Sequence, residues 1–91
     1  MSLKINFQNS FKKKYGLLSK DLKNRVEKAL KELERNPYHS YPLGKTRLRK
    51  KRINRKWRLI FTIQDHQIRI LDLIPSDGLT PHYVKRLLKL L

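Results

Sequence analysis

Residues 57 to 64 alternate between two sets of side chains, and this alternation constrains the fold more than any other feature of the sequence. The more apolar set consists of Trp57, Leu59, Phe61 and Ile63. The less apolar set consists of Arg58, Ile60, Thr62 and Gln64. Because successive side chains of a strand point to opposite faces, the pattern predicts a β-strand with one face in an apolar core.

Two neighbouring segments are expected to pair with this strand in an antiparallel meander. Asp65-His66 would form a tight turn, and the segment that follows, Gln67 to Ile74, is apolar on both faces, as is typical of a strand covered on both sides. Arg47 to Ile53 is only a weak strand by hydrophobicity. Because Asn54-Arg55-Lys56 has the length of a common hairpin loop, we expect Arg47 to Ile53 to be a strand as well.

The amino-terminal part is expected to form one strand and a short helix. Apolar and polar residues alternate from Leu3 to Phe7, which predicts a short strand. Asn9 or Ser10 could cap the helix that follows, and Gly16 would end it.

Two amphipathic helices are expected further along the chain. Ser19 is a candidate N-cap of the first, which would stop at Asn36-Pro37 because proline disfavours a helical residue before it. Pro37 to Gly44 then resembles a loop. In the second, Thr80 would cap, Pro81 would take the first helical position, and an apolar stripe would run to Leu91.

These segments predict an α+β fold in a single domain over residues 1–91, a length that suffices for one core and not for two. The meander and the first strand would form a four-stranded sheet, with the helical hairpin on the face that carries Trp57. The chain has no cysteine, which fits a cytoplasmic protein held by packing alone. No stretch approaches the roughly 20 apolar residues of a membrane span, so we expect a soluble, unprocessed protein.

The charge of the chain indicates a polyanionic partner. Lys and Arg number 23 against 7 Asp and Glu, which gives a net charge of +16, and there is no acid between Arg35 and Gln64. Within that gap the basic residues from 45 to 58 are Lys45, Arg47, Arg49, Lys50, Lys51, Arg52, Arg55, Lys56 and Arg58. Such a run is often only a solvated surface or a disordered tail. Because this one ends in a patterned strand, we favour a structured phosphate-binding surface.

Arg58 is the first candidate for chemistry on that surface. From the less apolar face of its strand, its guanidinium could donate two parallel hydrogen bonds to a phosphate and stabilise charge in a pentavalent transition state. A cross-strand salt bridge is the alternative role. His82 could transfer protons near neutral pH, and Tyr83 beside it is a second candidate that could equally belong to the core. His39 and His66 are expected to be solvated.

No cofactor is expected. The three histidines are scattered, no cluster of acids supports Mg²⁺, and there is no glycine-rich phosphate loop.

The run Lys51 to Phe61 resembles the hairpin core of the YoeB branch of the RelE/ParE toxin superfamily. The segment Phe11 to Pro37 is similar to the amino-terminal half of that family. The resemblance implies a RelE-like fold and a type II toxin that cleaves mRNA in the ribosomal A site by attack of a 2′-hydroxyl on the adjacent phosphate. It also implies a cognate antitoxin, with mRNA and the ribosome as further partners.

The resemblance also implies roles for individual residues. Arg58 matches the phosphate-binding arginine of the family. Lys51 and Arg49 fall near the positions of its strand lysines, and His82 or Tyr83 stands roughly where the family has a carboxy-terminal tyrosine or histidine.

Three functions remain open at this point. The first is the ribosome-dependent RNA endonuclease. The second is a ParE-like or inactive member that binds nucleic acid or a protein target without cleaving RNA, which the small set of candidate acids and bases favours. The third is a basic interaction module with no toxic role.

Overall fold

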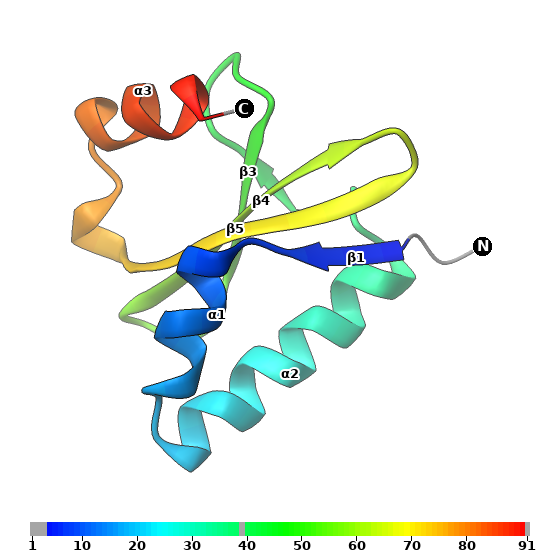
Figure 1. Cartoon of the computed structure of the whole chain (residues 1–91), viewed down its shortest axis with the longest axis vertical. Coiled ribbons are helices and arrows are strands. Elements are labelled where there is room, and N and C mark those ends of the chain that lie inside the picture. Colours follow the sequence, from blue (N-terminus) through cyan, green and yellow to red (C-terminus); the bar gives the residue numbers. More distant parts are fainter. Residues whose placement is uncertain (1–3, 39, 91) are drawn as a thin grey trace.

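The computed structural model describes residues 4–38 and 40–90, and it holds one sheet between two helical layers (Figure 1). In chain order the elements are β1 (Lys4–Phe7), α1 (Asn9–Gly16), α2 (Lys20–Arg35), β2 (Tyr41–Pro42), β3 (Leu48–Arg52), β4 (Trp57–Gln64), β5 (Gln67–Pro75), the 3-10 turn η1 (Ser76–Gly78) and α3 (Pro81–Lys89). The predictions that concern Leu3, His39 and Leu91 lie outside the described residues. None of the described helices has the length and apolar character needed to cross a membrane.

The α+β fold is confirmed, but the predicted number of strands is wrong. The sheet has five strands in the order β1-β5-β4-β3-β2, with β1 parallel to β5 and all other pairs antiparallel. The additional strand, β2, lies inside the segment predicted to be a loop. It is only two residues long and includes Pro42, so it carries no alternation that a sequence pattern could reveal.

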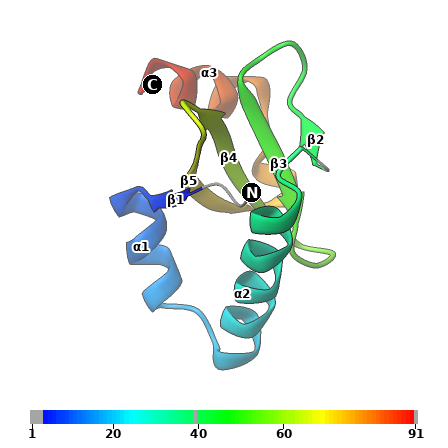
Figure 2. The ribbon, with the colours of Figure 1, turned by 90° about the vertical axis from the view of Figure 1, so that its right-hand side faces the viewer.

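The two faces of the sheet pack against different helices (Figure 2). The hairpin face is the one covered by the helical hairpin of α1 and α2, and the core between them consists of Phe11, Val26 and Leu33 from the helices and Leu59, Phe61, Ile68, Ile70 and Leu73 from the sheet. The α3 face is the opposite one, and the core there consists of Leu48, Ile60, Leu71 and Ile74 from the sheet and Leu87 from α3. Both faces are therefore apolar near their helices, as the pattern of Gln67 to Ile74 predicted.

Local hydrogen bonds explain where the helices begin. Ser19 Oγ accepts a bond of 3.3 Å from the Leu22 amide, and Thr80 Oγ1 accepts one of 3.1 Å from the Tyr83 amide, so both predicted caps are confirmed. The predicted cap at Asn9 or Ser10 is wrong, because α1 begins one residue earlier, after Gln8, with no side-chain cap. The Ser10 hydroxyl instead donates to a carbonyl of β5.

The pairing of β4 with β5 has two special features, a tight turn and a shift of register. Asp65 and His66 both have positive φ values, 50° and 61°, as a tight two-residue hairpin requires. Further along β5 the register with β4 shifts, because Ile60 pairs with Asp72 and Phe61 with Ile70. The shift is a β-bulge, and it places Asp72 opposite a residue whose side chain lies on the α3 face.

Candidate nucleic-acid interface

Arg58 is held at the start of β4 by the hairpin turn that precedes it. Asn54 Oδ1 accepts bonds of 2.9 Å from the amides of Lys56 and Trp57, which closes the turn. The carbonyl oxygens of Asn54 and Trp57 in turn accept bonds of 2.7 and 3.0 Å from Arg58 Nη1. One nitrogen of the guanidinium is thus fixed by the backbone, which orients the rest of the group without neutralising its charge.

A hollow of about 210 Å³ lies beside Arg58 and is lined also by Tyr41, Lys50 and Arg52. Arg52 and Arg58 are direct cross-strand partners, and Lys50 pairs with the α3-face residue Ile60. In residues 4–38 and 40–90 the ion pairs are Lys14–Asp72, Arg25–Asp21 and Lys51–Glu32, and none involves a cation of this hollow. Like charges directly opposite one another destabilise a sheet, and a bound anion would offset that repulsion.

Two other predicted site residues of β3 lie on the hairpin face. Lys51 pairs with the core residue Leu59, and its Nζ lies 2.6 Å from Glu32 Oε2 of α2. The hydrogen bond and charge of Lys51 hold the pKa of Glu32 below its usual value. Because side chains alternate along a strand, Lys51 and the Arg58 hollow are on opposite faces of the sheet. The structure does not bring Lys51 and Arg58 together.

Arg49, the other hairpin-face cation, holds the segment before β2. Its Nε donates to Ser40 Oγ over 2.7 Å, and its Nη2 donates to the carbonyls of Tyr38 and Ser40, each over 3.0 Å. The guanidinium of Arg49 is therefore engaged in hydrogen bonds within the fold.

The remaining predicted RNA-binding cations are exposed at the two ends of β3. Lys45 and Arg47 are in the turn between β2 and β3, and Arg55 and Lys56 are in the turn between β3 and β4. Lys56 Nζ lies 5.5 Å from the centroid of the Trp57 ring. These cations extend the positive surface beyond the hollow.

The two predicted proton-transfer residues differ in their surroundings. His82 is exposed at the start of α3. Tyr83 donates a bond of 2.6 Å to Asp72 Oδ2, and Lys14 Nζ lies 2.8 Å from the other carboxylate oxygen. Burial and the bond to Asp72 raise the pKa of Tyr83 above its usual value. Tyr83 and Asp72 line a separate hollow of about 500 Å³, so Tyr83 does not join Arg58.

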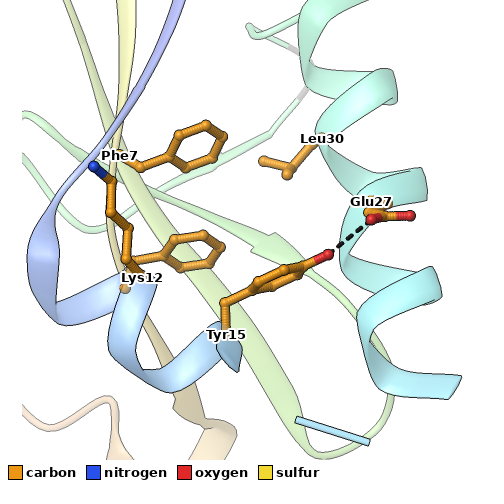
Figure 3. A pocket seen from close by; sticks show the side chains of 6 residues that line it. Phe7, Lys12, Tyr15, Glu27 and Leu30 are labelled. Carbon is orange, nitrogen blue, oxygen red and sulfur yellow. Dashed lines mark hydrogen bonds between the residues drawn. The ribbon is translucent and has the colours of Figure 1, made fainter. Parts of the chain in front are cut away.

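A third hollow, of about 320 Å³, lies between α1 and α2 (Figure 3). The rings of Phe7 and Phe11 stack there with centroids 5.5 Å apart, and Tyr15 donates a bond of 2.7 Å to Glu27. Among the described residues the lining is mostly aromatic and aliphatic, and Lys12 is the cation in it. It lacks the clustered positive charge of the Arg58 hollow.

One residue that lines the Arg58 hollow was missed by the sequence reasoning. Tyr41 lines the Arg58 hollow and was not among the predicted site residues, because the two-residue strand that carries it has no pattern of its own. Across the described ranges, no group of three or more metal-ligating side chains is close enough to hold a metal ion.

The arrangement of the sheet and helices is that of the RelE-like toxins. The free, doubly substituted RelE toxin of E. coli superposes with a TM-score of 0.77 at 17% identity, over 94% of this chain and 98% of that one. The toxin–antitoxin complex RelBE of E. coli matches with a TM-score of 0.73 at 15% identity, over 82% and 98% of the two chains. The YoeB dimer of Staphylococcus aureus gives 0.66 at 23% identity, over 81% and 97%.

A family model identifies the chain more specifically. The model of the ParE toxin of type II toxin–antitoxin systems, parDE, matches residues 5–77, and the chain belongs to this family. The predicted membership of the RelE/ParE superfamily, with RelE and YoeB proteins as relatives in fold, is thereby confirmed. No curated protein matches the sequence.

Proposed function

We propose that this toxin is a ribosome-dependent endoribonuclease that cleaves mRNA on the surface centred on Arg58. The observation that carries the proposal is the hollow in which Lys50, Arg52 and Arg58 gather without a carboxylate partner among the described residues. Three cations on an open strand surface match the spaced negative charges of an RNA backbone.

Arg58 would bind the phosphate at which the RNA is cut. In the reaction, the 2′-hydroxyl oxygen forms a bond to the adjacent phosphorus as its proton is removed. The bond from phosphorus to the 5′-oxygen breaks, and that oxygen takes up a proton, which leaves a cyclic phosphate. The guanidinium would stabilise the negative charge that develops on the phosphoryl oxygens. Lys50 and Arg52 would bind neighbouring phosphates, and exposed His82 is the candidate for proton transfer.

A second candidate function is binding without cleavage. Tyr83 is bonded to Asp72, and Lys51 is paired with Glu32, so both are engaged by the fold. Of the predicted proton-transfer residues, His82 is the exposed one. A toxin with this arrangement could block its target through the basic surface alone.

The proposed partners follow from charge and from the relatives. The E. coli RelBE structure is a toxin–antitoxin complex, so we propose a cognate antitoxin for this chain as well. With a net charge of +16, an antitoxin that covers the Arg58 hollow would be expected to carry acidic side chains. As a toxin that acts on translating ribosomes, the protein would work in the cytoplasm.

Primer extension on mRNA translated in a purified system tests the proposal. The wild-type protein should produce discrete cuts at the codon in the A site, and Arg58→Ala should reduce them at least about 100-fold, as expected for loss of a transition-state contact. Arg25→Ala on α2 removes the same charge from an exposed helix position and should cut normally. Stalled translation with intact mRNA would show that the toxin blocks its target without cleaving RNA, and would overturn the nuclease proposal. Cutting by Arg58→Ala at the normal rate would remove Arg58 from the site.

A further inference from the structure

Among the described residues that line the Arg58 hollow, Tyr41 is the aromatic one, and its side chain is exposed. Its relative exposure is 70%, which makes it one of the large apolar side chains that the fold leaves uncovered. It pairs across the sheet with Lys50 and shares the hollow with Arg52 and Arg58. Burial in the core therefore does not account for an aromatic ring at this position.

The backbone around Tyr41 is fixed in advance. Pro42 follows it and restricts Tyr41 to extended conformations. On the other side, Arg49 donates to the main-chain carbonyls of Tyr38 and Ser40 and to the Ser40 hydroxyl, bonds that do not depend on the Tyr38 side chain. Because the backbone is held on both sides of Tyr41, the segment loses less conformational freedom when a ligand contacts the ring.

An exposed aromatic ring on a held backbone, beside clustered cations, is suited to unpaired nucleotides. Each base of a single strand has a flat face that can stack on an aromatic side chain, whereas the bases of a duplex are stacked on one another and are unavailable. The cations would meanwhile bind the phosphates that join those nucleotides.

We propose that Tyr41 stacks on a base of single-stranded RNA while the phosphate beside that base occupies the hollow, and that Arg49 is the positioning residue for this contact. This inference rests on the proposed function, because it uses the same surface. It adds that the ligand is single-stranded, and it assigns a binding role to β2.

Equilibrium binding of a labelled, unstructured RNA oligonucleotide tests the stacking. Tyr41→Leu should weaken binding about 10- to 100-fold, the range for loss of one stacked base. Tyr41→Phe should bind within about 2-fold of wild type, because the ring is retained. Tyr38→Leu is the matched control, since Tyr38 is exposed to 66%, close to Tyr41, but does not line the hollow; it should also bind nearly normally.

Two further RNAs separate stacking from a structural effect. An oligonucleotide that keeps the phosphates but lacks bases should bind wild type and Tyr41→Leu equally, and so should a perfect duplex. If Tyr41→Leu loses affinity for the RNA without bases by the same factor, the residue acts on the fold and the stacking proposal is wrong. A loss of affinity in Tyr41→Phe would also overturn it.

The role of Arg49 is tested by a double-mutant cycle. Arg49→Lys keeps the charge but cannot reproduce the bonds to Tyr38 and Ser40, so it should weaken binding of single-stranded RNA. If Arg49 acts by placing Tyr41, adding Arg49→Lys to Tyr41→Leu should have little further effect. Fully additive losses would show that Arg49 contacts RNA independently, and unchanged binding by Arg49→Lys would remove its positioning role.

The same assay distinguishes this inference from the proposed function. If Arg58→Ala weakens binding and Tyr41→Leu does not, the phosphate site remains and the stacking proposal fails. If Tyr41→Leu weakens binding and Arg58→Ala does not, the stacking contact remains and the role of Arg58 fails. Wild-type protein that binds none of these RNAs overturns the stacking proposal, whereas the ribosome-dependent nuclease is overturned only by the absence of cuts in the primer-extension assay.

Discussion

Two groups of charged side chains on this sheet differ in whether the fold neutralises them. In the Arg58 hollow, three cations share one space with Tyr41, and the described residues supply no carboxylate to them. In the second group, the carboxylate of Asp72 receives bonds from Tyr83 and from the Leu73 amide and an ion pair from Lys14. The second group holds α1, α3 and the sheet together, whereas the first makes no such contact, and we propose that it is left for a ligand.

Removal of the buried carboxylate should have the largest effect on stability. Asp72 is only 8% exposed, and Asp72→Ala would remove the acceptor of the Tyr83 hydroxyl and of the Leu73 amide. We expect the free energy of unfolding to fall by about 3 kcal/mol, measured by urea denaturation. The control Asp77→Ala, at an exposed acid of η1, should change it by less than about 0.5 kcal/mol. Equal stability of the two variants would contradict a structural role for Asp72.

Tyr83→Phe should lower the free energy of unfolding by less, about 1 to 2 kcal/mol. It removes one hydrogen bond to the charged Asp72 and leaves the ion pair of Asp72 with Lys14. If Tyr83 serves only the fold, this variant should also cleave RNA at the wild-type rate per folded molecule. A large loss of cleavage with full stability would instead show that Tyr83 takes part in the chemistry.

The raised pKa of Tyr83 predicts the pH range in which this residue stabilises the folded state. The folded state keeps the phenol proton at pH values where the unfolded chain, with a tyrosine pKa of about 10, loses it. The stabilisation is therefore complete below about pH 10 and is lost as the pH rises above it. Unfolding curves at pH 8 and pH 11 should bring wild type and Tyr83→Phe closer together at the higher pH. A gap that widens with pH would contradict the assignment.

The turn that orients Arg58 should have a smaller effect on stability and a visible effect on activity. Asn54→Ala removes the acceptor of two amide bonds, so we expect a loss of about 1 kcal/mol in the free energy of unfolding. Because the same turn presents the carbonyl that fixes Arg58, RNA cleavage should fall about 10-fold. Asn54→Asp keeps an acceptor for the two amides, so it should retain most of the stability and most of the RNA cleavage of the wild type.

The meander could be predicted because its strands carry their own signal. Trp57 to Gln64 alternates over its whole length, although the prediction of one core face was too narrow: Ile60 and Thr62 are as fully buried as Leu59 and Phe61. β2 could not be predicted in this way, since its two residues become a strand only by pairing with β3. Tyr41 was missed for the same reason.

The candidate site was predictable only in part. A dense basic run predicts a positive surface, but its side chains divide between two faces according to strand register. The pairing of Arg52 with Arg58 places Lys50 on the same face and sends Arg49 and Lys51 to the other. The bond of Tyr83 to Asp72 likewise depends on how α3 packs on the sheet, which no local pattern encodes.

The ion pair of Lys51 with Glu32 should have the smallest effect of all, although it is as short as the contacts of Asp72. Both partners reach solvent, with side-chain exposures of 21% and 49%, so screening leaves it worth only a few tenths of a kcal/mol. The lowered pKa of Glu32 means that this stabilisation is present above about pH 4.3 and is lost as the pH falls below that value. Glu32→Gln should therefore match wild type at pH 3 and be slightly less stable at pH 7, as measured by thermal unfolding. A loss above about 2 kcal/mol at pH 7 would place Lys51 in the same class as Asp72, a charge on which the fold depends.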